Sequence, residues 1–242
     1  MGSVGKQRNT GATTVTTASG KITLPEPLAY GSYDVNVPQS ILDFEEKRKS
    51  AKIEFSLLVN DDGTVIESNK GGKYGVKAST SARLNADILS HNHPRSDDGI
   101  LGGTFSPGDI NNFMKYNQHT YRADAKEGVY SMTKGERLGN DVQLRADMYK
   151  AYRDFDAGVH KESGVQISKY TTEYTSQARQ IESDFRAGRI SREEAINRNN
   201  EAYGSYVVKA NAEVNRALVQ LHNWLIEHQK QYDYKYALFQ RG

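Results

Sequence analysis

Two histidines one residue apart, followed downstream by a serine and an aspartate, are the residues of this sequence best suited to metal chemistry. His91 and His93 stand in the run Ser-His-Asn-His-Pro. In an extended segment successive side chains alternate between two sides, so both imidazoles would point the same way. Asp109 follows a glycine-rich stretch and falls in the first turn of a helix that Ser106 would open, where its carboxylate could act as a third ligand. Two histidines, one carboxylate and a fourth position left to water are a common make-up of catalytic zinc sites.

The order of these residues is more specific than the ligand count. His-x-His-Pro, followed by Ser-x-x-Asp at Ser106 and Asp109, resembles the signature of the JAMM (JAB/MPN) metallopeptidases, which include deubiquitinating isopeptidases and the JAB domain of RadC-type proteins. The resemblance covers the stretch from Glu46 to Lys134. The segment between His93 and Ser106 is longer here than in the compact family pattern.

The resemblance implies zinc as the cofactor, held by His91, His93 and Asp109. Ser106 would help to stabilise the oxyanion that forms during the reaction. The implied reaction is hydrolysis of an amide or isopeptide bond in a protein or peptide substrate, with zinc lowering the pKa of its bound water toward neutrality.

The family also uses a glutamate on an upstream strand, and here we assign that role to Glu54. It lies near the start of the strand-like run Ile53–Val59, which ends in the turn signal Asn60–Gly63. As a general base, Glu54 would take a proton from water and return it to the leaving amine. Glu45, Glu46 and Glu67 are the neighbouring alternatives.

A structural role is the rival hypothesis. The His-Asn-His-Pro loop running on to Gly-Gly-Thr-Phe-Ser looks like domains attached to phage minor head proteins and related mobile-element proteins, which implies an assembly protein with an active or inactive JAMM-like domain. Nucleases of the HNH class fit less well because their motif residues are dispersed over a ββα unit. Metal-dependent phosphoesterases normally need further histidines or carboxylates downstream. The remaining histidines lie in no comparable motif and are interpreted as packed or surface residues: His119, His160, His222 and His228.

Composition limits the other classes of function. The chain has 242 residues, which leaves room for one domain with appendages or two small domains. It has no cysteine, so disulfides and thiolate metal sites are excluded. A formal net charge of +2 gives no electrostatic argument for nucleic acid as a partner. No apolar run approaches the roughly 20 residues that span a bilayer, and no signal peptide is recognisable. We therefore expect a soluble, cytoplasmic protein, or a virion-associated one if the protein is phage-encoded.

The predicted fold class is α/β: a JAB/MPN-like mixed sheet flanked by helices. Residues 1–40 are predicted to form a flexible arm and linker, 41–140 the zinc domain and 141–242 a helical region. The expected elements of the middle region are a helix over Ile41–Ser50, strands over Ile53–Val59, Thr64–Glu67, Val76–Ala78 and Asp87–Ser90, a helix around Ala82–Ala86 and a closing strand over Gly128–Met132.

The last hundred residues have a helical pattern. Apolar residues recur at helical spacing at Val207, Val214, Leu218, Leu221 and Leu225. The pattern breaks at Arg186–Ile190, and Ser191 followed by Glu194 is a capping-box signature. We therefore predict two long helices packed as a hairpin, whose apolar stripe would serve self-association or docking of a partner. The aromatic tail Tyr232–Tyr236 fits either a strand or an exposed docking segment.

Overall fold

The centre of the protein is a mixed six-stranded sheet. The computed structural model describes residues 4–8, 13–17, 20–24, 34–94 and 99–239. The strands of the sheet lie in the order β10-β9-β8-β7-β5-β6, and among them only β7 and β8 run parallel. Their bounds are β5 Phe55–Val59, β6 Val65–Lys70, β7 Ile88–Asn92, β8 Thr120–Asp124, β9 Val129–Lys134 and β10 Tyr234–Phe239. The chain is thus an α/β protein, as the order of elements predicted.

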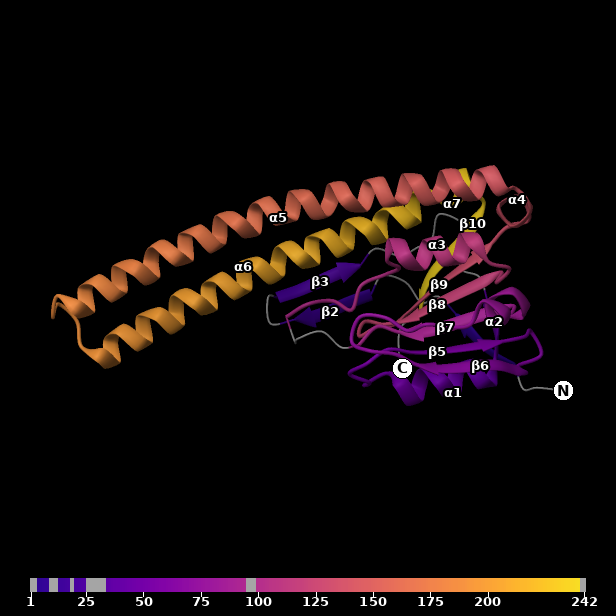
Figure 1. The fold of residues 1–242 in the computed structure, drawn as a ribbon, viewed down its shortest axis with the longest axis horizontal. Coiled ribbons are helices and arrows are strands. Elements are labelled where there is room, and N and C mark those ends of the chain that lie inside the picture. Colours follow the sequence, from indigo (N-terminus) through magenta and orange to yellow (C-terminus); the bar gives the residue numbers. More distant parts are fainter. Residues whose placement is uncertain (1–3, 9–12, 18–19, 25–33, 95–98, 240–242) are drawn as a thin grey trace.

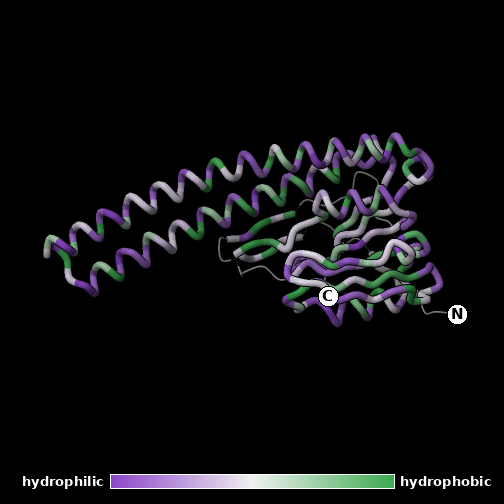
Figure 2. The backbone as a smooth tube through the Cα atoms, viewed as in Figure 1, coloured by the Kyte–Doolittle hydropathy of each residue, from purple (hydrophilic) through white to green (hydrophobic). Residues whose placement is uncertain are grey.

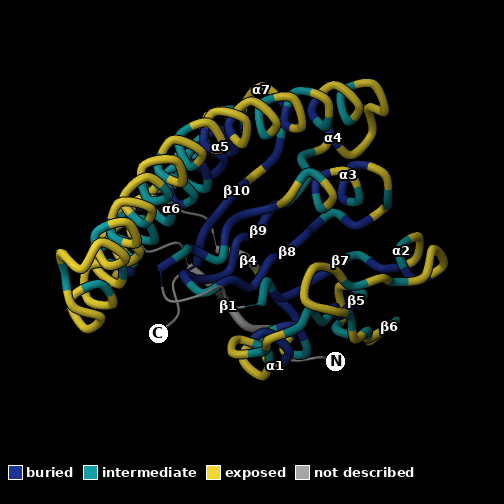
Figure 3. The backbone as a smooth tube through the Cα atoms, turned by 60° about the vertical axis from the view of Figure 1, so that its left-hand side comes forward, coloured by how far each residue is buried: buried dark blue, intermediate teal, exposed yellow. Residues whose placement is uncertain are grey.

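Helices cover both faces of this sheet (Figure 1). Helix α1 (Gln39–Arg48) packs Ile41 and Phe44 against Leu57, Val59 and Ile88 on one face. Helix α3 (Pro107–Lys115) and the base of a long helical hairpin bury the other face in a larger core. The remaining helices are α2 Thr80–Asn85, α4 Glu136–Asn140, α5 Val142–Arg186, α6 Arg192–Glu227 and α7 Gln229–Tyr232. The central strands are buried from both sides (Figure 3).

The described residues of the predicted arm and linker form short paired strands. Strand β1 (Val4–Arg8) pairs with β4 (Asp34–Pro38), and β2 (Thr13–Thr17) pairs with β3 (Gly20–Leu24), both antiparallel. Leu24 is fully buried in the main core, which explains how a threonine- and glycine-rich segment is anchored. Gln39 and Ser40 begin α1, and the remaining residues of the predicted arm and linker, including the prolines at positions 25 and 27, lie outside the described ranges.

Two strand predictions need correction, and one strand of the sheet was not predicted. Val76–Ala78 is not a strand, because β6 is the sheet edge and ends at Lys70, after which the chain bends at Lys73 and Tyr74. Strand β8 was not predicted, because the charged residues Arg122 and Asp124 make its sequence look like an exposed segment. Every residue of this strand is nevertheless buried. Strand β9 does not close the sheet, because β10 pairs along its outer side.

The predicted helical hairpin is confirmed. Helices α5 and α6 pack along each other and extend far beyond the sheet (Figure 1). Gly188, with a positive φ of 67°, lies in the turn between them, and the Ser191 side chain accepts a hydrogen bond from the Glu194 backbone at the start of α6. Helix α5 begins at Val142, well before the region in which the apolar pattern is visible. The aromatic tail forms β10 from Tyr234 onward, after Tyr232 has ended α7, so the structure selects the strand over the docking segment.

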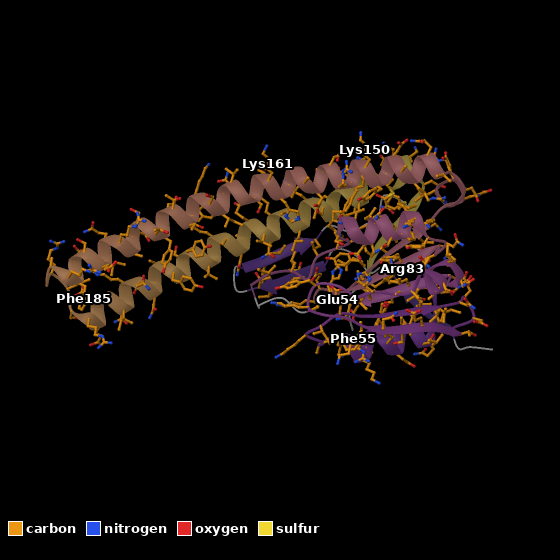
Figure 4. The ribbon with its side chains drawn as sticks, in the orientation of Figure 1. Glu54, Phe55, Arg83, Lys150, Lys161 and Phe185 are labelled. Carbon is orange, nitrogen blue, oxygen red and sulfur yellow. The ribbon has the colours of Figure 1, made fainter. Side chains whose placement is uncertain are left out.

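The outer half of the hairpin is more exposed than its base. Hydrophilic residues recur along both helices (Figure 2), and Phe185 lies at the far end (Figure 4). Lys150 and Lys161 lie on α5 along the side that points away from α6 (Figure 4). Within the described ranges, no helix combines the length and apolar character that crossing a bilayer requires.

Candidate metal centre

Strand β7 brings the two histidines to one side of the sheet. His91 lies inside the strand, opposite Ser56 of β5 and Ala123 of β8. His93 follows the strand end, and its backbone N–H donates to the Asp124 carbonyl at 2.8 Å, which continues the strand alignment. The Nε2 atoms of the two imidazoles are 3.1 Å apart. The alternation predicted from sequence therefore places both rings in one site.

Helix α3 supplies the carboxylate. Ser106 is its N-cap, Pro107 its first residue, and Ser106 and Asp109 form a reciprocal capping box. Oδ2 of Asp109 accepts hydrogen bonds from the Ser106 backbone N–H at 2.9 Å and from the Ser106 hydroxyl at 2.7 Å. Asp109 Oδ1 lies 3.2 Å from His91 Nε2, and Asp109 Oδ2 lies 3.7 Å from His93 Nε2. Despite the long insertion before Ser106, the aspartate meets both histidines.

The spacing of the three donors fits one small cation. Ligand atoms about 2.0–2.1 Å from a tetrahedral zinc ion are separated from each other by roughly 3.3–3.4 Å. The two imidazole nitrogens are 3.1 Å apart, and the nearest carboxylate oxygens of Asp109 lie 3.2 Å (Oδ1 to His91) and 3.7 Å (Oδ2 to His93) from them, all close to that value. Two imidazole nitrogens and a carboxylate also favour zinc over magnesium or calcium, which prefer oxygen ligands throughout. His91, His93 and Asp109 are therefore an arrangement that could hold a metal ion.

Hydrogen bonds and nearby charges set the tautomer of His93 and the ionisation state of Asp109. His93 Nδ1 lies 3.0 Å from the Gly103 carbonyl, which can only accept, so Nδ1 carries the proton and Nε2 faces the site. Burial alone would lower the pKa of His93, but hydrogen bonding and attraction to Asp109 raise it above its ordinary value. Burial opposes ionisation of Asp109, yet its interactions with His91 and His93 hold its pKa well below the usual range. The aspartate is thus an anion ready to bind a cation.

Glu54 lies beside the ligands, immediately before β5. The side chain of Asn92, between the two histidines, clamps the segment around it: Asn92 Nδ2 donates to the Ile53 carbonyl at 3.0 Å, and Asn92 Oδ1 accepts from the Phe55 N–H at 2.7 Å. Burial raises the pKa of Glu54, opposed by attraction to His91 and His93. This carboxyl therefore holds a proton more readily than an exposed glutamate does.

Among the alternatives to Glu54, none lines the cavity. Glu45 is buried on the α1 face, where it pairs with Arg122 at 2.7 Å and accepts from Ser90 at 2.9 Å. Glu46 forms an exposed ion pair with Lys49. Glu67 accepts from the Ser79 backbone at 2.9 Å near the start of α2. These contacts give all three glutamates structural roles.

A cavity of about 470 Å³ opens onto the ligands. Glu54, Ser106 and the three ligands line it on one part of its surface. The segment after β6 contributes further lining residues, Lys73, Tyr74, Gly75, Val76 and Ala78, and α2 contributes Arg83. Tyr74 is 86% exposed, so its ring is available at the cavity rim. Figure 4 shows Glu54 and Arg83 within the sheet-bearing part of the molecule, far from the hairpin tip.

The other histidines have partners outside the candidate metal centre. His222 is fully buried, with Nδ1 2.8 Å from the Tyr236 hydroxyl, and His228 stacks on Trp224 with ring centroids 4.0 Å apart. His160 lies 3.4 Å from Asp156 on α5. His119 contacts Asp61 at 2.8 Å and, with Asp87, forms a second cluster of metal-ligating residue types at the surface.

Sequence reasoning missed two parts of the site. The first is Asn92, which looks like a spacer between ligands but orients the segment carrying Glu54. The second is the Gly103 carbonyl that fixes the His93 tautomer. The closely spaced glycines were the available signal for the second part, because they mark a backbone that approaches other groups closely. For the first part, no sequence signal distinguishes Asn92 from a spacer.

Comparisons of the chain with protein-family models, with curated proteins and with solved structures found no match.

Proposed function

We propose that this protein is a zinc-dependent hydrolase of amide or isopeptide bonds, of the JAMM type. The observation that carries the proposal is the convergence of His91, His93 and Asp109 at 3.1–3.7 Å beside Glu54, at the wall of a cavity. Three protein ligands with room for a fourth are typical of catalytic rather than structural zinc sites, in which four protein ligands close the coordination sphere.

Each residue would have a distinct chemical role. A zinc ion, when bound, would supply Lewis acidity and bring the pKa of water toward neutrality. Glu54 would accept a proton from the attacking water and donate it to the leaving amine, a double role that suits a carboxyl with a raised pKa. Asp109 and the histidines would hold the ion, and the cavity would hold the acyl side of the substrate.

Ser106 has two candidate roles, and each requires its hydroxyl proton to point in a different direction. The resemblance implies oxyanion stabilisation, for which the hydroxyl must donate to the substrate. In the structure that hydroxyl donates to Asp109 Oδ2 at 2.7 Å. A hydroxyl has a single proton to donate, so Ser106 would orient Asp109 in the resting site and would have to rotate to assist an oxyanion.

Metal analysis combined with a cleavage screen tests the proposal. We expect one zinc per chain by plasma mass spectrometry after purification without chelator, and cleavage of members of a library of peptide and isopeptide-linked substrates that stops when zinc is removed and resumes when it is restored. A chain that neither retains zinc nor binds it in titration would contradict the proposal.

A second candidate function is an assembly role, in which a JAMM-like domain belongs to a phage or mobile-element head protein. The observation that favours it is the hairpin, which extends beyond the sheet and exposes apolar side chains at Val165, Ile196, Tyr203 and Val208. Stacked tyrosines add to this surface, with the rings of Tyr174 and Tyr206 5.6 Å apart. Zinc binding without cleavage of any library member, together with self-association measured by light scattering, would favour this function.

A further inference from the structure

The segment Gly99–Phe105, which we call the strap, connects the two halves of the candidate metal centre. It lies between His93 and Ser106, and its Gly103 carbonyl is the acceptor for His93 Nδ1. A loop that sets the orientation of a metal ligand must itself be held, because a mobile carbonyl would leave the imidazole free to rotate. The contacts of the strap show what holds it.

Helix α6 holds the beginning of the strap through one side chain. Asn215 is buried, and its Nδ2 donates to the Gly99 carbonyl at 2.8 Å. Its Oδ1 accepts from the Leu101 backbone N–H at 2.8 Å. The Asn215 side-chain amide thus pairs with one backbone carbonyl and one backbone N–H of the strap, as a neighbouring strand would.

The turn between β8 and β9 holds the middle of the strap. Both oxygens of the buried Glu127 carboxyl accept backbone N–H groups, from Gly102 and Gly103, each at 2.8 Å. The Tyr130 hydroxyl donates to Glu127 Oε1 at 2.6 Å and so fixes the carboxyl. The peptide units on either side of the Gly103 α-carbon are therefore fixed on one side by Glu127 and on the other by His93.

The end of the strap is tied to the C-terminal region. The Thr104 hydroxyl lies 2.7 Å from the Tyr236 hydroxyl of β10, which also lies 2.8 Å from His222 Nδ1 of α6. The Tyr152 hydroxyl of α5 donates to the Phe105 carbonyl. Strand β10 and helix α5 therefore contact the end of the strap through residues that are 132 and 47 positions away from their partners in sequence.

The glycines of the strap fit this close packing. A Cβ atom at Gly99 would lie 2.2 Å from Asn211 Nδ2 of α6, and one at Gly102 would lie 2.8 Å from the Lys126 backbone nitrogen. Gly103 has a φ of +82°, and a Cβ atom there would lie 3.0 Å from Leu218 of α6. The glycine-rich insertion is thus shaped to fit between α6 and the β8–β9 turn.

We propose that Asn215 and Glu127 are positioning residues of the metal centre, which hold the Gly103 carbonyl where it fixes the tautomer and direction of His93. The inference rests on the proposed metal function of His93. It makes helix α6 part of the metal site although α6 supplies no ligand. Loss of an outer hydrogen-bonding partner of a metal ligand typically lowers metal affinity by about 10- to 100-fold. We expect an effect of this size for each residue.

The test compares two variants with two controls in the full chain. Asn215→Ala removes both bonds to the strap, and Glu127→Gln keeps the shape of the side chain but directs an amide N–H₂ group at one of the two strap N–H groups. Asn200→Ala changes an exposed asparagine of the same helix. Ser163→Ala removes a buried hairpin bond, to the Glu213 carbonyl at 3.3 Å, that does not touch the strap.

Zinc affinity by chelator competition and the visible absorption of the cobalt(II)-loaded protein are the measurements. Circular dichroism of the metal-free proteins checks folding. We expect both strap variants to fold, to bind zinc about 10- to 100-fold more weakly and to show an altered cobalt spectrum, while both controls match the unmodified protein. Unchanged affinity and spectrum in Glu127→Gln and Asn215→Ala would overturn the inference and leave the metal site intact. An equal loss in Ser163→Ala would also overturn it, since general loosening of the hairpin would then be the cause. Absence of zinc binding by the unmodified protein would overturn both proposals.

Discussion

Within the part of the chain that the structure describes, there are two clusters of metal-ligating residue types, and their environments differ. His91, His93 and Asp109 form a buried centre, with side chains 4%, 15% and 15% exposed. The surface cluster of Asp61, Asp87 and His119 includes side chains that are 67% and 43% exposed at Asp61 and His119.

The partners of each cluster differ as well. At the surface, His119 Nε2 contacts Asp61, while Asp87 accepts from the Asp61 backbone N–H at 3.0 Å and thereby ties a turn to the start of β7. At the buried centre, hydrogen bonds from outside the triad orient His93 and Asp109 and leave the donor atoms facing one another. Residue types and their proximity are therefore common to the two clusters. Burial beside a cavity and outer hydrogen bonds that direct the donor atoms distinguish the two clusters.

The largest effect is expected from removing one ligand in each cluster. His93→Ala should lower zinc affinity by well over the roughly 100-fold upper range for outer partners, because a direct ligand is lost. His119→Ala should leave zinc affinity unchanged. Isothermal titration with zinc measures both, and zinc addition should raise the melting temperature of the unmodified protein and of His119→Ala only. Equal losses in the two variants would remove the distinction between the clusters.

Glu54→Gln should separate metal binding from catalysis. The substitution keeps the shape of the side chain and removes the proton acceptor, so zinc should remain bound while hydrolysis of a confirmed substrate falls by about 10²- to 10⁴-fold. Glu46→Gln is the matched control, because Glu46 is exposed and does not line the cavity. Loss of zinc from Glu54→Gln would show that Glu54 is itself a zinc ligand. Full activity would mean that another group handles the proton.

Two serine N-caps allow the structural and site contributions of Ser106 to be compared. Ser106 accepts from the Asp109 N–H at 3.2 Å, and Ser191 accepts from the Glu194 N–H at 3.1 Å. Each substitution by alanine should destabilise the fold by about 1 kcal/mol in chemical denaturation. Only Ser106→Ala should also weaken zinc binding, by about 10-fold, because its hydroxyl orients Asp109. Unchanged zinc affinity with reduced turnover would instead assign Ser106 to the oxyanion.

The smallest effect is a pH dependence of zinc stabilisation. The pKa of His93 is raised, so its contribution to the stability of the metal-free protein is present below about pH 6.5 and is lost as the pH rises through the folded value. The pKa of Asp109 is lowered, so its contribution is present above about pH 3.9 and is lost as the pH falls through the folded value.

Zinc must replace the proton of His93, so the increase in melting temperature caused by zinc should be larger at about pH 7.5 than at about pH 5.5. Thermal unfolding with and without zinc at the two pH values measures the difference. His93→Ala should show no such increase at either pH. A zinc effect that is equal at both values would argue against His93 as a ligand.

Local pattern was enough to predict several parts of the molecule. The His-x-His spacing on a strand, the serine cap with Asp109 in the first turn and the two long C-terminal helices all depend on residues within a few positions of one another. These features follow from side-chain alternation, capping and helical periodicity, which act over short sequence distances. The sequence therefore determined that His91, His93 and Asp109 could bind a metal and which element carries each of them.

The tertiary structure decided which of these elements contact one another. Asp109 reaches the histidines because the strap folds back between α6 and the β8–β9 turn, through a bond from Leu101 to Asn215, 114 residues away. Strand β8 is buried although it contains Arg122, because Glu45 of α1 pairs with that guanidinium. Contacts over such separations form only when the chain has collapsed around its core, and the residues that make them carry no local pattern by which they could be recognised.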